Sequence, residues 1–314
     1  MKLDGRILYL TDDTAQIAAQ LGGRDLQLSV DAPMHYGVNT DGMISGRACT
    51  LGYTPEILGP YFLENFRETV AKDDVRTGGF QVIVGGDAYG SGSSREVAVV
   101  AHEGAGIELV VARSFQRIFQ ENMVYGGMPF TTDYGVLDQL RAGEEVDVST
   151  FFDELPAFFN QVATKGGLLA YGNAWLEGSV EPWYEIETAT RPLNVVEKIC
   201  SARAWSGGYP GAGAGPTFGI TSVRPGDQVL CRAGFRGMHE YTAGMVMALY
   251  EEAFGNVPVK DPEQCAAFED HFVLIDEPTV PDAVKESRLI PAQQLAAEMV
   301  EACTAHGIRL HGPG

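Results

Sequence analysis

Apolar residues in the first part of the chain form short runs that are separated by polar turns. Three of these runs have the length and continuity of buried strands: residues 6–10, 81–84 and 107–112. Segments with helical spacing of apolar residues follow the second and third runs, at 97–101 and 115–122. Because strands that alternate with helices are typical of layered folds, the pattern predicts an α/β layer structure.

The rest of the chain adds helical periodicity and two short extended segments. Residues 151–164, 241–254 and 291–306 place their apolar side chains at helical spacing. Residues 166–171 and 271–275 have an extended pattern. The sequence therefore predicts that a second, smaller α/β segment follows the first.

A linker divides the two segments. Pro182 and residues 187–192 bring proline together with small and polar residues, and a new apolar segment begins at 195–199. A chain of 314 residues is long enough for about two domains. We therefore expect one domain over 1–190 and a second over 191–314.

A glycine-rich stretch at residues 206–219 lies inside the second domain. A phosphate-binding loop would follow a strand and carry a lysine, and this stretch does neither. We expect a surface loop or a lid.

The formal charge of −20 narrows the possible partners. Nucleic-acid binding needs a basic surface, and so does docking on an anionic membrane. No apolar run approaches the roughly 20 residues of a membrane helix, and residues 1–6 are unlike a signal peptide. We expect a cytoplasmic protein that binds neither nucleic acid nor membrane.

The cysteines are few, odd in number and widely spaced. They are Cys49, Cys200, Cys231, Cys265 and Cys303. Metal sites and iron–sulfur sites that lie within one short segment carry closely spaced pairs such as C-x-x-C, which are absent here. The spacing predicts reduced, structural thiols and no metal site in this chain.

The sequence Gly-Ser-Gly-Ser-Ser-Arg-Glu at residues 90–96 is the strongest candidate for a chemical site. It follows the apolar run at 81–84 and precedes the helical segment at 97–101. The first backbone N–H groups of a helix have no partner within the helix, so a strand, a glycine-rich turn and a helix start together favour an anion. Arg95 adds a guanidinium that can grip a carboxylate through two hydrogen bonds. The motif predicts a small polycarboxylate ligand.

A longer stretch around this motif resembles a known family. Residues 85–96, 110–119 and 127–129, together with Asn122, are similar in order to the swivel domain of the aconitase superfamily, which includes the small subunits of isopropylmalate isomerases. The resemblance implies a layered β/α swivel domain. Relative to those small subunits, residues 12–35 look inserted.

Four later segments resemble the beginning of the catalytic region of the same superfamily: 195–199, 224–230, 239–242 and 268–271. Ordinary aconitases place the swivel domain last, whereas here it comes first. In the family the catalytic region continues further and supplies three cysteines that hold a [4Fe-4S] cluster. The resemblance therefore implies one half of a split enzyme, with the cluster on a cysteine-bearing catalytic subunit.

The resemblance also implies roles for single residues. The family dehydrates and rehydrates a hydroxy di- or tricarboxylate through an unsaturated intermediate. Ser94 takes the role of the base, while Ser93 and Arg95 hold a substrate carboxylate. Asp270 and His271 match the pair whose histidine protonates the departing hydroxyl and whose aspartate orients the ring.

Two further residues are candidates for substrate binding. His239 stands where isopropylmalate isomerases carry a histidine, and Arg47 follows an Asn-Thr-Asp sequence at residues 39–41 that resembles a loop of the family. Each also has a structural interpretation. A histidine is often a capped or partly buried ring, and Asn-Thr-Asp is typical of a turn.

Three functions stay open at this point. The first is a subunit of an iron–sulfur hydro-lyase or isomerase of the isopropylmalate or aconitate type, with its active site shared with a partner. The second is a non-catalytic subunit that binds carboxylates or regulates, and that kept the fold. The third is a cluster-free enzyme that uses serine and histidine alone, although without a metal the departing hydroxide would lack its main electrophile.

Overall fold

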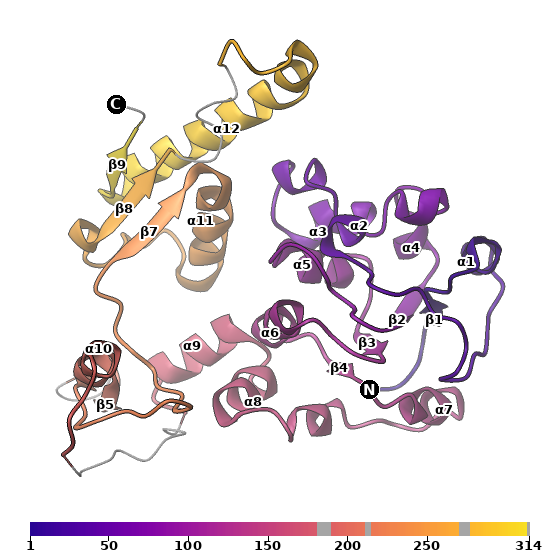
Figure 1. Ribbon diagram of the computed structural model, residues 1–314, viewed down its shortest axis with the longest axis horizontal. Coiled ribbons are helices and arrows are strands. Elements are labelled where there is room, and N and C mark those ends of the chain that lie inside the picture. Colours follow the sequence, from indigo (N-terminus) through magenta and orange to yellow (C-terminus); the bar gives the residue numbers. More distant parts are fainter. Residues whose placement is uncertain (181–189, 211–214, 270–276, 313–314) are drawn as a thin grey trace. The chain divides into compact units, whose positions relative to one another are not determined.

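The structure is a computed structural model that describes residues 1–180, 190–210, 215–269 and 277–312. The chain divides into two compact units, Met1–Ala174 and Trp175–Gly314 (Figure 1). Each unit combines helices with a parallel sheet, so the predicted α/β class is confirmed. The expected domain boundary at residue 190 stays a prediction.

The first unit is built on a parallel sheet of four strands in the order β1-β2-β3-β4 (Figure 1). The strands are β1 (Arg6–Tyr9), β2 (Phe80–Gly85), β3 (Leu109–Ala112) and β4 (Phe130–Thr131). The three strands predicted from apolar runs are confirmed as β1, β2 and β3. β4 has only two residues, which is too short to produce a run in the sequence.

Helices pack around the sheet of the first unit, with α3 and α5 on one side and α7 on the other (Figure 1), while α8 packs against α6 and the Val148–Phe152 turn. The helices that begin in this unit are α1 (Thr14–Leu21), α2 (Thr40–Met43), α3 (Pro55–Leu58), α4 (Asp74–Thr77), α5 (Val97–Gly104), α6 (Arg117–Gly126), α7 (Gly135–Arg141), α8 (Ala157–Thr164) and α9 (Leu168–Leu176), the last of which continues beyond the end of the unit at Ala174. Single 3₁₀ turns lie at Ala48–Thr50, Gly59–Tyr61, Phe66–Glu68 and Val148–Phe152.

The core of the first unit follows the two-residue period of its strands. Alternate side chains such as Tyr9, Val84 and Val111 form one buried cluster with Leu137 and Leu140 of α7. Since successive side chains of a strand point to opposite faces, the intervening residues face the other layer. Burial on both faces explains why these strands are continuous apolar runs.

Two predictions in this unit were wrong in detail. Residues 166–171 are not extended, because α9 occupies Leu168–Leu176. The buried residues of this helix, Tyr171 and Ala174, are three positions apart, which is helical spacing. The helix predicted over 151–164 is a 3₁₀ turn followed by α8, and the two are separated at Pro156, which precedes the first helical residue.

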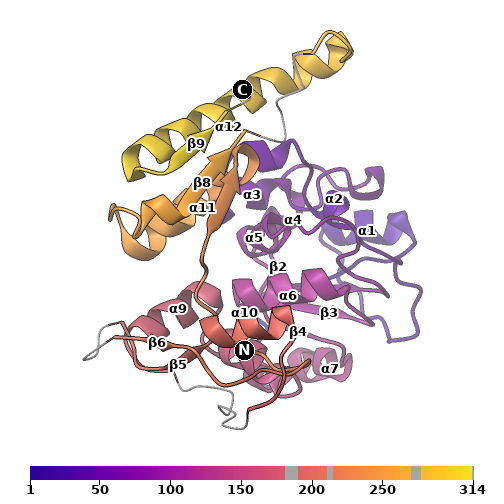
Figure 2. The same cartoon turned by 60° about the vertical axis from the view of Figure 1, so that its left-hand side comes forward.

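The second unit has two small sheets. β5 (Trp205–Gly207) and β6 (Thr217–Phe218) pair antiparallel and form the two ends of the glycine-rich stretch (Figure 2). β7 (Arg236–His239), β8 (Cys265–Phe268) and β9 (Arg309–His311) are parallel. The strand predicted at 271–275 and the middle of the glycine-rich stretch, 211–214, lie outside the described residues.

Three helices complete the second unit: α10 (Val195–Arg203), α11 (Glu240–Phe254) and α12 (Asp282–His306). A 3₁₀ turn at Pro262–Gln264 precedes β8. α11 was predicted almost to the residue, whereas α12 begins at Asp282, directly after Pro281, rather than at 291. α11, β8 and α12 share a small core of Ala243, Ala267, Met299 and Cys303. None of the helices in the described parts of the chain is both long and apolar enough to cross a membrane.

Candidate active-site loop

Residues 90–96 form the predicted turn between β2 and α5. Gly90 and Gly92 have φ angles of 81° and 98°, a left-handed conformation that glycine adopts without steric cost. A Cβ atom at Gly90 would lie 2.2 Å from the ring of Phe119. Both the backbone conformation and the close packing on α6 therefore require glycine at position 90.

The loop is fastened to residues 37–40 by backbone hydrogen bonds. Gly37 N–H donates to Asp87 O, Gly90 N–H to Val38 O and Thr40 N–H to Ser91 O, each at 2.8 Å. Two hydroxyls tighten the junction. Ser91 Oγ donates to Gly37 O at 3.1 Å, and Thr40 Oγ1 donates to Ser93 O at 2.9 Å. Two stretches about fifty residues apart thus act as one structural piece.

The extension of β3 supports the loop from its other side. Tyr89 N–H donates to Ser114 O at 3.0 Å, and Gln116 N–H donates to Tyr89 O at 2.9 Å. Ala88 N–H donates to Ser114 Oγ at 2.9 Å. The loop is therefore held between two neighbouring segments.

Arg95 already binds a carboxylate of the protein. Its Nη2 lies 2.6 Å from Oδ1 of Asp41, and its Nη1 donates to Ile44 O at 2.9 Å. The Arg95 side chain is 19% exposed and the Asp41 side chain 63% exposed. The guanidinium is thus fixed in direction while its anionic partner stays at the surface.

Asp41 was not singled out from the sequence, although it belongs to the Asn-Thr-Asp stretch. Asn39 caps α2 through its side chain, with Gly42 N–H donating to Oδ1 at 2.6 Å. This cap places Asp41 in the first turn of the short helix. The sequence predicts a turn at residues 39–41. It does not predict that Asp41 pairs with Arg95, because this contact depends on the tertiary fold.

Ser93 and Ser94 are both exposed, in front of the first turn of α5. Within the described part of the chain, the hydroxyl of Ser94 makes no hydrogen bond. Burial raises the pKa of the neighbouring Glu96 carboxyl, which directly precedes α5. Ser94 is therefore a surface hydroxyl beside an ordered arginine.

Arg47 is exposed and lies just before the Ala48–Thr50 turn. A Cβ atom at the adjoining Gly46 would lie 3.7 Å from Nη2 of Arg95, so the chain at residues 46–47 passes close to that guanidinium. The structure thus brings Ser93, Ser94, Arg95 and the backbone next to Arg47 together. Substrate binding by these residues stays a prediction.

The other predicted residues belong to the second unit. His239 is the last residue of β7 and caps α11, with its ring stacked on Tyr241 at a centroid distance of 6.5 Å. Asp270 and His271 lie outside the described residues. His239 occupies the N-cap position of α11, where its backbone N–H donates to Thr242 Oγ1 at 3.5 Å, and its approach to substrate stays a prediction.

A buried polar pair lies beneath the loop. The Tyr89 hydroxyl and His102 Nε2 are 2.8 Å apart, and His102 Nδ1 is 2.6 Å from Ala98 O. Because a carbonyl only accepts, Nδ1 carries the proton and Nε2 accepts from the hydroxyl. Burial lowers the pKa of His102 to about 4 and raises the pKa of Tyr89. The pair is neutral and holds the loop from below through Tyr89.

The comparisons with known proteins match the part of the chain that contains the loop at residues 90–96. The family model for the aconitase C-terminal domain matches residues 67–132. The isopropylmalate/citramalate isomerase small subunit of Methanocaldococcus jannaschii is 34% identical over 149 residues, which are 43% of this chain and 86% of that protein. The 3-isopropylmalate dehydratase small subunit 1 of Archaeoglobus fulgidus is 32% identical over 157 residues, 45% of this chain and 92% of that protein.

The chain belongs to the isopropylmalate dehydratase small-subunit family of the aconitase superfamily. A crystal structure of 3-isopropylmalate dehydratase from Methanocaldococcus jannaschii is 27% identical and covers 44% of this chain and 87% of that one, with a TM-score of 0.32. The membership therefore rests on the sequence relatives. Their matches span less than half of this small-subunit family member, so the resemblance of residues 195–271 to a catalytic region stays a prediction.

The described residues of this family member do not fit an iron–sulfur cluster. Cys49, Cys265 and Cys303 are buried, Cys200 is half-buried and Cys231 is exposed, and all are free thiols. Nowhere in the described ranges do three or more His, Cys, Asp or Glu side chains gather as a metal site. A cluster needs several thiolates in one place, so these residues could not hold one.

Proposed function

We propose that this chain is a subunit of an isopropylmalate dehydratase-type hydro-lyase. The enzyme dehydrates and rehydrates a small hydroxy di- or tricarboxylate, and its active site is shared with a catalytic subunit that carries a [4Fe-4S] cluster. The observation that carries the proposal is Ser94, an exposed hydroxyl beside the ordered guanidinium of Arg95. The relatives named as dehydratase small subunits support the reaction class.

Arg95 holds a carboxylate of the substrate in this proposal. A guanidinium offers two parallel N–H groups to a carboxylate, and Asp41 occupies one of them in the structure. The substrate carboxylate displaces the exposed Asp41 side chain, while the bond to Ile44 O keeps the guanidinium in place. Ser93 adds a hydroxyl donor from the same turn.

Ser94 removes the proton from the carbon next to that carboxylate. A serine is a weak base, so its alkoxide needs nearby positive charge, and Arg95 and the start of α5 provide it. The same charges stabilise the negative charge that develops on the substrate carboxylate. His271, oriented by Asp270, protonates the departing hydroxyl, and His239 and Arg47 contact other oxygens of the substrate.

The experiment is an anaerobic purification from the native host, followed by turnover assays on the assembled complex. We expect a cysteine-rich partner to copurify with iron–sulfur absorbance, and Ser94→Ala to abolish turnover while partner and cluster stay bound. Ser149→Ala, at an exposed serine outside the loop, is the matched control and keeps full turnover. Unchanged turnover in Ser94→Ala would contradict the role of Ser94.

The alternative is a non-catalytic subunit that binds carboxylates or regulates. It predicts no hydratase activity in any complex, with carboxylate binding that survives Ser94→Ala and is lost in Arg95→Gln. The exposed, unbonded hydroxyl of Ser94 favours the enzyme, since binding alone does not need it.

A further inference from the structure

A cavity of about 400 Å³ lies in the first unit between residues 27–30 and α7. It is separate from the loop at residues 90–96, none of which lines it. Residues 27–30 belong to the stretch that looks inserted relative to small isomerase subunits. The cavity volume is in the range that holds small ligands.

Both ends of this inserted wall are fixed. Arg6 Nε contacts Asp25 Oδ1 at 2.7 Å, just before the wall. Arg113 donates to the carbonyls of Val30 and Ala32 at its far end. A wall held at both ends gives the cavity a defined shape. Little of the wall must then become ordered when a ligand binds, which lowers the entropic cost of binding.

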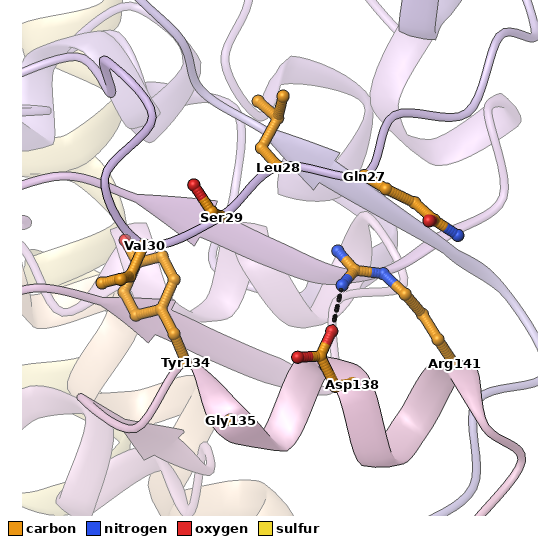
Figure 3. Close-up of a pocket in the computed structure, with 8 residues that line it drawn as sticks. All are labelled: Gln27, Leu28, Ser29, Val30, Tyr134, Gly135, Asp138 and Arg141. Atoms are coloured by element: carbon orange, nitrogen blue, oxygen red, sulfur yellow. Dashed lines mark hydrogen bonds and ion pairs between the residues drawn. The ribbon is translucent and has the colours of Figure 1, made fainter.

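Arg141 supplies a cation whose donors are largely unused. Its side chain is 18% exposed, and one N–H of Nη1 donates to Asp138 Oδ1 at 2.8 Å. Nη2 is buried and has no hydrogen-bond partner. Burial also lowers the pKa of the Arg141 guanidinium. A guanidinium carries five N–H donors; those on Nη2 are closed to solvent, so an anion in the cavity is held by the remaining donors and by the positive charge. Figure 3 shows it extending from α7 toward residues 27–30, beside Asp138.

The remaining walls are mostly apolar. Leu28 and the ring of Tyr134 pack against the core cluster under α7, and Val30 is 47% exposed. The Tyr134 hydroxyl is already bonded to Gly85 O, so this residue offers the cavity its ring. The cavity therefore combines one cationic end with aliphatic and aromatic sides.

We propose that this cavity binds a small monocarboxylate with a short aliphatic body. The carboxylate accepts from Arg141, and the body lies against Leu28, Val30 and the ring of Tyr134. Asp138 places a negative charge beside the guanidinium, so a second carboxylate on the ligand is repelled. The site is thus distinct in chemistry from the Arg95 loop, where a polycarboxylate is proposed.

The test is calorimetric titration of the full chain with 4-methylpentanoate, and with succinate as the dianionic comparison. We expect saturable binding of 4-methylpentanoate and weaker binding of succinate at this site. Arg141→Met keeps the length of the side chain and removes its donors, so it should lower the affinity by at least about tenfold. Asp138→Asn removes the competing charge and should raise the affinity severalfold.

Arg76→Met is the matched control, because it removes a guanidinium that pairs with an aspartate three residues away, as Arg141 does, but lies outside both sites; it should leave 4-methylpentanoate binding unchanged. Loss of binding in Arg95→Gln with no change in Arg141→Met would overturn the proposal, and so would the absence of binding to the wild-type chain. If Arg141→Met fails to fold, Val30→Trp at the exposed wall replaces it and should block the cavity. Turnover of the complex is not used, so this result stands apart from the proposed hydro-lyase.

Discussion

The side chain of Asp41 occupies a hydrogen-bonding position on Arg95 that a substrate carboxylate would use. The contact is short, at 2.6 Å, but Asp41 is 63% exposed and is screened by solvent. Exposed ion pairs contribute at most about 1 kcal/mol. A substrate with two or more carboxylates can therefore replace Asp41 at low cost.

This competition predicts the effect of Asp41→Asn. The amide keeps the size of the side chain and removes its charge, so the affinity of Arg95 for carboxylates should rise about two- to fivefold. The measurement is KM in the assembled complex, or binding of the substrate to this chain if no turnover is found. A rise in KM would show instead that Asp41 orients Arg95. Asp13→Asn, at an exposed aspartate that caps α1, is the control for the loss of one negative charge.

The buried His102 makes stability depend on pH. Its pKa is about 4 in the folded protein and about 6.5 when exposed, so the unfolded chain binds more protons between these values. The contribution of His102 to the free energy of unfolding should therefore fall by about 3 kcal/mol as the pH drops from 6.5 to 4. Urea titrations across this range measure it.

His102→Gln separates this effect from other titrating groups. Glutamine does not ionise, so the share of the slope due to His102 should disappear. Tyr89→Phe should keep the slope and lower stability by about 1–3 kcal/mol, because Nε2 then lacks a donor. An unchanged slope in His102→Gln would contradict the assignment.

The place of single residues in the fold was predictable where one short motif contains them. Ser93, Ser94 and Arg95 share a turn whose glycines, strand and helix start are all readable in sequence. Asp41 and His102 were missed because their partners lie elsewhere in the chain or in the buried layer. A single sequence does not show which distant residues pair in the folded protein.

Among the elements, α3 and α5 pack through bare backbone. A Cβ atom at Gly59, just after α3, would lie 2.1 Å from Gly104 O, and one at Gly104 would lie 2.0 Å from Pro55 O. Neither glycine has a left-handed φ angle, so the requirement is for close approach. The loop at residues 90–96 leads directly into α5, so this contact helps to fix the position of the end of the loop.

Gly59→Ala and Gly104→Ala should each destabilise the protein by about 2–3 kcal/mol, since backbone atoms must separate. Gly172→Ala in α9 is the matched control. It has open space around it, so it should be neutral or stabilise by up to about 1 kcal/mol. Thermal unfolding of the three variants tests the difference, and equal effects would contradict the packing argument.

Elements were predictable where periodicity was long and unbroken. The strands β1 to β3 and the helix α11 have such patterns. The segment at 166–171 was misassigned because six residues do not distinguish a strand from the first turns of a helix. Its preceding glycines, at φ angles of 88° and 108°, form the turn that allows α9 to begin.

At the scale of the whole molecule, the first unit contains its own sheet, core and loop. We predict that residues 1–174 fold alone, with a cooperative thermal transition and a far-ultraviolet circular dichroism spectrum typical of α/β proteins. The pH dependence due to His102 should persist in this fragment. A fragment that is unfolded, while the full chain is stable, would show that the second unit is required for folding.

The division of the chain was partly visible in composition, since a linker near residues 187–192 and a new apolar segment at 195–199 could be read. The order of strands in each unit could not be predicted from the sequence, because it depends on contacts between distant segments. Membership in the small-subunit family accounts for less than half of the chain.

The loop at residues 90–96 is joined to residues 37–40 by two main-chain hydrogen bonds and by two more that the hydroxyls of Ser91 and Thr40 donate to main-chain carbonyls. Main-chain hydrogen bonds survive most changes of side chain. Under the proposed function, mutations in the neighbouring surface stretch that includes Asp41 and Arg47 can therefore alter which acid is recognised while the main chain of the loop stays in place. A protein that works as proposed could then acquire new substrates during evolution while Ser94 and Arg95 keep their places on the loop.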